Sequence, residues 1–439
     1  MILPRERTSP ADDPLAALLR GDYVDAETGR SVGVQTKSLV IEDTLAGREA
    51  DLVTELGFGG TLAVVSDRIT HEVLGRRVER ALDGRHKVVS ILLDRDVHPD
   101  QQTVDVIRAA TGSADAFIAV GSGTINDLTK YASASAGKPY AVFGTAPSMN
   151  GYTSLTASIT QHGHKLTLPA QAPAGAFFDL GVLAAAPARM IRAGLGDSIC
   201  RNTAQADWLL SHLLFGTDYR QLPFDLLVDD EAQLIELAKP LIGGDLAAMR
   251  VLVRVLILSG FGTAIVGSSA PASQGEHLIS HYIDMMGDPS RPSVLHGEQI
   301  GVTTLSIARL YDRMLEQPPV VKADTTTQEE MRAIFGDELL GSVWPEFALK
   351  RLDAAKAEAL NARLATGWDD ICGRIEELRL PTATIEAVLR EAGGPLTPEA
   401  IHLERSFYEQ AVQHGREIRN RYTILDLAAQ SGRLDPHSL

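Results

Sequence analysis

Cysteine is scarce in this chain, whose 439 residues include only Cys200 and Cys372. The N-terminal residues 1–7 also lack the apolar core of a secretory signal peptide. Without such a signal, both thiols are expected to stay reduced. A disulfide-stapled secreted protein is therefore excluded, and a cytoplasmic protein is predicted.

An excess of positive charge is also missing. Lysine and arginine total 41 against 57 aspartate and glutamate residues, giving a formal net charge of −16. Nucleic acids and anionic membranes require basic surface, so neither is expected as a partner. A small anionic substrate needs only a few local cations and stays possible. No apolar run approaches the roughly 20 residues that cross a bilayer, so no membrane span is expected.

The first part of the chain alternates short apolar strands with helices. We expect strands at residues 37–42, 61–67, 88–93, 114–120 and 140–143, and helices at residues 46–56, 69–82, 99–111 and 125–136. This alternation predicts a parallel sheet wound by helices. The runs are continuously apolar, as in parallel strands buried on both faces.

Beyond Pro187 the apolar spacing becomes that of helices, and no strand is expected. We expect helices at residues 191–215, 229–239, 246–259, 275–286, 297–311, 328–335, 349–367, 368–378, 382–392 and 397–419. The prediction is an NAD-binding α/β domain over residues 1–185 and an all-helical domain for metal and substrate over residues 186–439.

The stretch 192–208 contains two glycines close to an acid. Gly194 and Gly196 are expected to break the preceding segment, which would place Asp197 where a helix starts. Arg201 follows four residues later on the same face. It would either neutralise an anionic substrate or pair with a nearby acid.

Three histidines lie in two later segments. His277 and His281 share one face of a predicted helix, and His296 stands in a His-Gly turn. Imidazole and carboxylate groups bind divalent metals together, and a catalytic site keeps one position open for substrate. Any three of Asp197, His277, His281 and His296 suffice, so the spacing predicts a metal site without choosing its histidines.

The segment Gly121-Ser122-Gly123-Thr124 lies between a predicted strand and helix. Glycines there let the backbone approach a diphosphate, to which the helix start offers free N–H groups. The spacing is not the six-position dinucleotide fingerprint, so an ordinary turn is an equal alternative. Asp127 lies in the first turn of this helix, where its carboxylate could have a functional role or simply interact favourably with the helix dipole. Asp67 ends an earlier strand, where it would bind an adenosine ribose and favour NAD over NADP, or be a solvated turn acid.

The loop at residues 145–154 follows another strand and is crowded with hydroxyl groups. Pro147 and Gly151 are expected to fix its path. Four side chains in it are candidates to hold a nicotinamide or a polar substrate: Thr145, Ser148, Asn150 and Ser154.

Five motifs, in this order along the chain, resemble the sn-glycerol-1-phosphate dehydrogenases, within the wider group of glycerol dehydrogenases, iron-containing alcohol dehydrogenases and dehydroquinate synthases. The motifs are Gly121-Ser-Gly-Thr-Ile-Asn-Asp, Thr145-Ala-Pro-Ser-Met-Asn-Gly-Tyr-Thr-Ser, Gly194-Leu-Gly-Asp-Ser, Glu276-His-Leu-Ile-Ser-His and His296-Gly-Glu-Gln. The resemblance implies a dehydroquinate synthase-like fold with the active site in a cleft between its two domains.

The resemblance also implies roles for single residues. It places the metal on Asp197, His277 and His296, and leaves His281 beside the metal or toward the substrate. It places Gly121, Ser122 and Gly123 at the cofactor diphosphate, Thr145 and Ser148 near the nicotinamide, and Asp127 near the reacting carbon.

The chain departs from the family pattern at three positions. Ser122 replaces the middle glycine of a triplet, which makes the turn less free. Asn150 stands where the family commonly has aspartate, so a charge near the substrate is lost. Arg201 stands where bacterial relatives tend to have lysine, so a cation is kept.

The expected function is that of a metal-dependent, NAD(P)-linked oxidoreductase interconverting sn-glycerol-1-phosphate and dihydroxyacetone phosphate. Zinc is the expected metal, with nickel and iron(II) as alternatives, and His281 or a water chain would carry the proton. Relatives suggest a homo-oligomer. The alternatives are a dehydrogenase of another polyol or polyol phosphate, a cyclase of the dehydroquinate synthase type, and an inactive binding protein. The cyclases typically present glutamate as the carboxylate ligand, so Asp197 favours the dehydrogenase.

Overall fold

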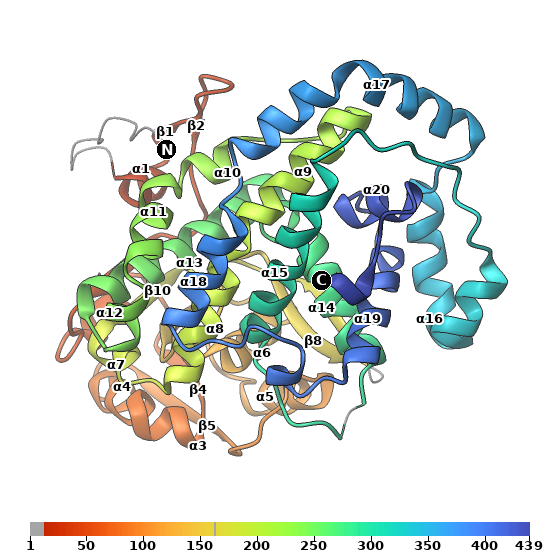
Figure 1. The fold of residues 1–439 in the computed structure, drawn as a ribbon. Helices are drawn as coiled ribbons and strands as arrows, with labels where there is room; N and C mark the ends of the chain where they lie inside the picture. The colour runs from red at the N-terminus through yellow and green to blue at the C-terminus, as the bar shows by residue number, and fades with distance from the viewer. Residues whose placement is uncertain (1–12, 162–163, 289) are drawn as a thin grey trace. The chain divides into compact units, whose positions relative to one another are not determined.

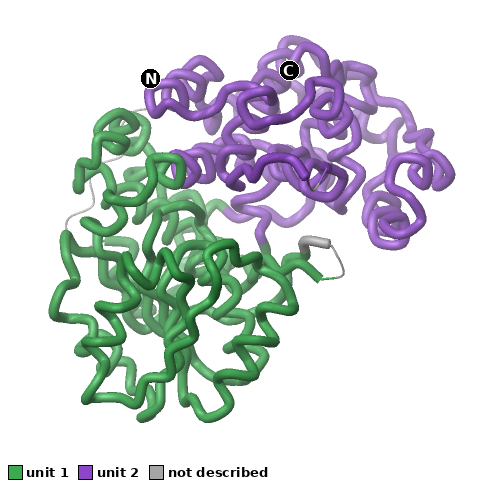
Figure 2. The backbone as a smooth tube through the Cα atoms, turned by 90° about the horizontal axis from the view of Figure 1, so that it is seen from below, with its two compact units in different colours: residues 1–191, 221–268 green, residues 192–220, 269–439 purple. Residues whose placement is uncertain are grey.

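A computed structural model describes residues 13–161, 164–288 and 290–439. Residues 1–7, where no signal-peptide core is expected, lie outside the described residues. The chain forms two compact units, coloured separately in Figure 2. The first comprises Met1–Ile191 and Gln221–Ser268, and the second comprises Arg192–Arg220 and Ser269–Leu439.

The first unit is built on a six-stranded parallel sheet with the strand order β3-β10-β7-β6-β4-β5. Its strands are β3 (Ser38–Glu42), β4 (Thr61–Asp67), β5 (Lys87–Leu93), β6 (Ala116–Gly121), β7 (Tyr140–Gly144) and β10 (Gly175–Asp179). The predicted α/β architecture is confirmed. Strands β6 and β7 are buried along their whole length, as their continuous apolar sequences predict. Strand β10 is buried as well.

Helices connect these strands and complete the first unit (Figure 1). They are α1 (Pro14–Arg20), α2 (Glu49–Thr54), α3 (Arg68–Thr70), α4 (Arg76–Leu82), α5 (Gln101–Ala110), α6 (Gly123–Ser135), α7 (Leu180–Ala184), α10 (Leu222–Asp225), α11 (Val228–Glu236), α12 (Ala238–Ile242) and α13 (Leu246–Val266). A π-helical turn, His71–Gly75, joins α3 to α4. Apolar side chains from α2, α4 and the strands form one core beside the sheet.

Three strand features of the first unit are absent from the sequence prediction. They are β10, the antiparallel pair β1 (Tyr23–Val24) and β2 (Ser31–Val32), and the hairpin of β8 (Thr156–Gln161) and β9 (His164–Pro169). Strand β10 follows β7 by more than 30 residues and inserts between β7 and β3. Its sequence is a short apolar run that ends in Asp179, and periodicity alone does not identify such a run as a strand.

In the described part of the chain after α7, all regular elements are helices, as predicted. The helix α8 (Ala188–Ile199) enters the second unit at Arg192. The other helices of that unit are α9 (Arg201–Phe215), α14 (Gly275–Met286), α15 (His296–Met314), α16 (Gln328–Lys350), α17 (Ala354–Glu376), α18 (Thr382–Glu391), α19 (Arg405–His414) and α20 (Ile424–Gln430). They enclose a second apolar core of their own.

Helix α13 shows why residues 221–268 group with the α/β half. It packs against α7, α10, α11 and α12 and also contacts β3 (Figure 1). The compact units therefore interleave along the chain, which differs from the simple division predicted at residue 185. Helix order along the sequence does not reveal this, because which element a helix packs against depends on tertiary contacts.

Helix α13 also corrects an expectation about membrane spans. Its 21 residues are long and apolar enough to cross a bilayer by length and composition, whereas no such stretch was expected. However, 67% of its most apolar window is buried inside the protein. The helix also carries Arg250 and Arg254, which pair with acids of the same unit. These features are those of a core helix.

The glycines at 194 and 196 do not break a helix, and this prediction is wrong. Both lie inside α8, and Asp197 lies near the end of that helix instead of at the start of the next. A Cβ on Gly196 would come within 2.1 Å of the Gly297 carbonyl oxygen, and one on Gly297 within 1.8 Å of the Ala193 carbonyl oxygen. Gly196 and Gly297 are needed because the backbones of α8 and α15 lie in direct contact at these two positions.

Candidate active site

Three predicted cofactor segments meet at the carboxyl edge of the sheet. Strands β4, β6 and β7 are neighbours, and Gly121 at the end of β6 pairs with Gly144 at the end of β7. Strand β5 lies on one side of β4, and the next strand of the chain, β6, lies on the other side of β4, so the strand order reverses at β4. Ligands of such sheets bind where the strand order reverses, outside the carboxyl ends. This position brings Asp67, Ser122 and Thr145 to one edge.

The turn between β6 and α6 has the backbone geometry of an anion site. Ser122 is extended at the N-cap of α6, and among the described residues its side chain makes no capping hydrogen bond. The first-turn N–H groups of α6 are thus left for a ligand. A Cβ on Gly121 would lie 2.4 Å from the Ile125 Cβ, so the tight turn requires glycine. This turn fits the diphosphate predicted at Gly121, Ser122, Gly123 and Thr124.

Asp67 caps the helix that follows its strand. Its Oδ1 accepts hydrogen bonds from the Ile69 and Thr70 N–H groups, at 2.7 and 2.8 Å. The residue is 9% exposed, so it is not a solvated turn acid. Its Oδ2 makes no hydrogen bond among the described residues and is the oxygen that could meet a ribose.

Two candidates in the first unit have side chains committed within that unit. Asp127 accepts the Ser158 N–H at 3.0 Å and the Asn126 side-chain amide at 3.1 Å. The Ser154 hydroxyl lies 3.0 Å from the Gly151 and Thr156 carbonyl oxygens. Both side chains therefore shape the segment beyond β7, and their predicted contacts with the reacting carbon and the cofactor stay predictions.

Thr145 and Ser148 lie at the start of the loop after β7. The Thr145 N–H donates to the Gly121 carbonyl at 3.1 Å, which fixes this loop to the β6–α6 turn. Thr145 is buried and Ser148 is half-buried. Their position at the carboxyl edge is compatible with the predicted nicotinamide contacts.

The second unit brings Asp197, His277 and His296 together. The Asp197 Oδ1 lies 4.0 Å from Nε2 of His277 and 3.9 Å from Nε2 of His296. One donor atom from each residue lies within 4.8 Å of the other two. Asp197 and His277 are buried, whereas the His296 side chain is 32% exposed and gives the cluster an open side.

The donor set fits a divalent metal. Two donors about 2.1 Å from one ion lie at most about 4.2 Å apart, so both measured separations allow a shared ion. The His277 Nδ1 lies 2.9 Å from the Glu276 carboxylate. A proton on Nδ1 that donates to Glu276 leaves the Nε2 lone pair facing Asp197, the usual carboxylate–histidine–metal arrangement. Burial raises the pKa of Glu276 to about 7.

His281 and Arg201 belong to the same unit as this cluster. The His281 ring centroid lies 5.9 Å from that of His277 and 6.4 Å from that of His296. Arg201 begins α9 and is 1% exposed. The structure thus gathers all three histidines, and the roles of His281 and Arg201 in proton transfer and phosphate binding stay predictions.

A second possible metal group, formed by Cys200, Glu276 and His277, overlaps the first. Glu276 already accepts the Gln274 N–H at 2.8 Å, and the Cys200 thiol lies 3.2 Å from the Asp197 carbonyl oxygen. A thiol that donates there keeps its proton, whereas metals bind the thiolate. We therefore favour the cluster centred on Asp197.

Sequence reasoning missed three buried residues around these segments. Glu276 is adjacent to His277 in sequence, and helical spacing gives no reason to expect neighbours to face each other. Asp207 accepts the Gly275 N–H at the start of α14. Lys130 has its ammonium against the loop after β7. Asp207 and Lys130 lie in helices that carry several other polar residues, so nothing in the sequence singles them out.

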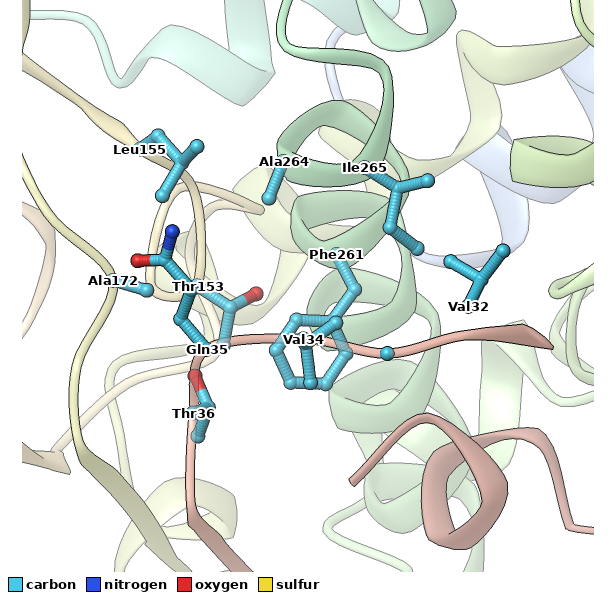
Figure 3. A pocket seen from close by; sticks show the side chains of 11 residues that line it. Val32, Val34, Gln35, Thr36, Thr153, Leu155, Ala172, Phe261, Ala264 and Ile265 are labelled. Carbon is cyan, nitrogen blue, oxygen red and sulfur yellow. The ribbon is translucent and has the colours of Figure 1, made fainter. Parts of the chain in front are cut away.

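Two cavities lie in the first unit. One, of about 230 Å³, is lined by residues 32–36, Thr153, Leu155 and the last turns of α13 (Figure 3). The other, of about 280 Å³, lies near Lys37, Phe58 and Pro139. Neither is lined by Asp67, Ser122 or Thr145.

The family model of iron-containing alcohol dehydrogenases matches residues 40–187. A probable glycerol dehydrogenase from Sinorhizobium meliloti has the same fold, with a TM-score of 0.60, 15% identity, and coverage of 92% of this chain and 97% of that one.

Two curated relatives are glycerol-1-phosphate dehydrogenases [NAD(P)+]. That of Halalkalibacterium halodurans is 30% identical over 83% of this chain and 85% of its own. That of Pyrococcus furiosus is 33% identical over 67% of this chain and 85% of its own. With this identity over most of both relatives, and with the matching fold, the chain belongs to the glycerol-1-phosphate dehydrogenase family.

Proposed function

We propose that this protein is a metal-dependent, NAD(P)-linked dehydrogenase that interconverts sn-glycerol-1-phosphate and dihydroxyacetone phosphate. The observation that carries the proposal is the cluster of Asp197, His277 and His296, with one open side at His296. Two relatives that share most of their length with this chain carry the same activity in their names. The two units would divide the work, with the cofactor on the first and the metal on the second.

A divalent metal on Asp197, His277 and His296 would act as a Lewis acid on the substrate oxygen. Glu276 would hold His277 in the tautomer that presents Nε2. His281 would exchange the proton that the substrate oxygen gains on reduction, and Arg201 would balance the phosphate charge. The nicotinamide would supply the hydride. The first unit would hold the cofactor diphosphate at Ser122 and orient the nicotinamide through Thr145 and Ser148.

We further propose zinc as the metal, since two imidazoles and one carboxylate with a free position form a catalytic zinc site. Nickel and iron(II) accept the same donors. The protein would work in the cytoplasm as a homo-oligomer on a small phosphorylated polyol. Its net charge of −16 disfavours nucleic acid and anionic membranes as partners.

The test is the oxidation of NADH or NADPH in the presence of dihydroxyacetone phosphate, monitored by the near-ultraviolet absorbance of the reduced cofactor. Elemental analysis of the same protein identifies its metal. Asp197→Ala and His277→Ala should abolish turnover and metal binding without unfolding the protein. His437→Ala is the matched control, because this exposed histidine pairs with Glu409 away from the cluster. Full activity of metal-free protein would contradict the proposal.

The same assay separates the alternatives. Equal turnover of dihydroxyacetone and its phosphate would indicate a dehydrogenase of free polyols. Substrate conversion without net NADH consumption would indicate a cyclase, which uses the cofactor transiently.

A further inference from the structure

The buried charge of Lys130 lies on the helix that begins at the candidate diphosphate turn. Lys130 is 0% exposed. Its three N–H groups face four oxygens within hydrogen-bond distance: the Gly151 carbonyl oxygen, the Ser154 carbonyl and hydroxyl oxygens, both at 3.2 Å, and the Thr156 carbonyl oxygen at 3.1 Å. All four acceptors belong to one short segment, so a single ammonium fixes the path of that segment.

A second charge on the same helix holds the next residues. Asp127, one turn before Lys130 on α6, accepts the Ser158 N–H at 3.0 Å. The cation thus binds backbone carbonyl groups and the anion binds a backbone N–H. Together they attach the segment from Gly151 to Ser158 to α6.

Helix α13 holds the same loop at other points. A Cβ on Gly260 would lie 2.2 Å from the Thr153 Oγ1 and 2.6 Å from the Asn150 carbonyl oxygen. The Thr153 hydroxyl donates to the Ile257 carbonyl at 3.0 Å. At Thr153 and Leu155, however, the loop borders the cavity of about 230 Å³ shown in Figure 3. Hydrogen bonds therefore contribute to holding the loop where apolar packing is incomplete.

Core packing alone does not explain a lysine at this position. Removing an ammonium from water is costly unless polar groups replace the water. Four oxygen acceptors replace it here, and they lie on the loop that also carries Ser148 and follows Thr145. An apolar residue would fill the volume without binding those oxygens.

We propose that Lys130 is a positioning residue that sets the conformation of the loop after β7, residues 145–156, and thereby the affinity for the nicotinamide half of the cofactor. Lys130 itself touches no cofactor atom in this proposal. The inference rests on the proposed function, because it assumes that Thr145 and Ser148 meet the nicotinamide. It adds a residue of the α6 interior to the groups that determine cofactor binding.

The test compares two ligands on the full-length protein by calorimetric titration. NADH uses both the diphosphate turn and the loop, whereas ADP-ribose lacks the nicotinamide and uses only the diphosphate side. Lys130→Met should raise the Kd for NADH by about tenfold or more, which corresponds to a loss of about 1.4 kcal/mol of binding free energy. ADP-ribose affinity should change by no more than about twofold, or about 0.4 kcal/mol.

Lys138→Met is the matched control. Lys138 follows α6 and donates to the Ala114 carbonyl, so the substitution removes a lysine–carbonyl contact of the same unit away from the loop. It should leave both affinities unchanged. If Lys130→Met does not yield folded protein by circular dichroism, Lys130→Gln, which keeps two donors without the charge, is measured in the same way.

Equal losses of NADH and ADP-ribose affinity would overturn the inference, because they would mean that Lys130 only stabilises α6. Unchanged NADH affinity in a folded variant would overturn it as well. Failure of the unmodified protein to bind either ligand would instead overturn the proposed function and the inference with it.

Discussion

Gly196 in α8 faces the carbonyl oxygen of Gly297 in α15 so closely that a Cβ at position 196 would lie 2.1 Å from that oxygen. Asp197 and His296 directly adjoin these two glycines in sequence. Their side chains reach within 3.9 Å of each other. The close backbone contact of the two helices therefore determines the spacing of two candidate metal ligands.

Gly196→Ala should separate α8 from α15, because the obstacle is backbone and cannot move as a side chain would. Overpacking of this kind costs about 1–3 kcal/mol. We expect a lower melting temperature and a zinc affinity at least about tenfold weaker, measured by chelator competition. Gly301→Ala, in the partner helix α15, is the control, since its Cβ would meet the Leu389 side chain at 3.4 Å and the Gly196 Cα at 3.8 Å, both ordinary contacts. Equal zinc affinities for the two variants would contradict the argument.

Glu276→Gln should weaken metal binding while the fold is kept. The substitution removes the charge next to the His277 Nδ1 but preserves the shape of the side chain. Loss of such an outer carboxylate typically lowers metal affinity by about 10–100-fold. Glu417→Gln is the matched control, because Glu417 accepts a hydrogen bond from the His414 Nδ1 at 3.1 Å outside the cluster. Similar zinc affinities for the two variants would argue against the role of Glu276.

Lys130 predicts a specific dependence of stability on pH. Burial lowers the pKa of Lys130 to about 8, from 10.5 in an exposed lysine. Between these values Lys130 holds a proton in the unfolded chain that it has released in the folded chain, so its contribution to the free energy of unfolding rises with pH. In the folded protein, burial raises the pKa of the neighbouring Tyr140 and Tyr152 above this window. Their phenols titrate near pH 10 in the unfolded chain, and this contribution cancels when the unmodified protein is compared with Lys130→Met.

The difference in unfolding free energy between the unmodified protein and Lys130→Met should therefore increase from pH 8 to 10.5. The total increase is about 3 kcal/mol, since one pKa unit corresponds to about 1.4 kcal/mol. Urea denaturation at several pH values measures it. A constant difference across the window would show that Lys130 stays protonated.

The sequence predicted features that depend on local patterns. The strand Thr61–Asp67 has the predicted bounds, and helix α6 begins two residues before its predicted start. The convergence of His277 and His281 followed from helical spacing. The spacing made all three histidines candidate ligands, and the family resemblance chose His277 and His296 over His281.

The features that were missed depend on contacts between distant residues. Gly196 was interpreted as a helix breaker because its partner Gly297 is about 100 residues away in sequence. Strand β10 was missed because its place between β3 and β7 is set by non-local pairing. The buried Asp207 belongs to the same class, as its partners lie on α14, α15 and α20.

Asp207→Asn should destabilise the second unit and loosen the start of α14. The Asp207 Oδ1 accepts hydrogen bonds from the Tyr311 hydroxyl and the Ile424 N–H, both at 2.7 Å, and its Oδ2 accepts the Gly275 N–H at 3.0 Å. An asparagine has only one acceptor oxygen, so its NH₂ group must face at least one buried N–H donor. An unsatisfied buried donor costs about 1–3 kcal/mol.

Because Gly275 lies two residues before His277, we expect Asp207→Asn to lower zinc affinity as well as the melting temperature. Tyr311→Phe is the informative comparison, since it removes one donor and leaves both oxygens of Asp207 in place. It should cost about 1 kcal/mol of stability and leave zinc affinity unchanged. If Asp207→Asn lowers the melting temperature alone, Asp207 anchors the helices without setting the position of His277.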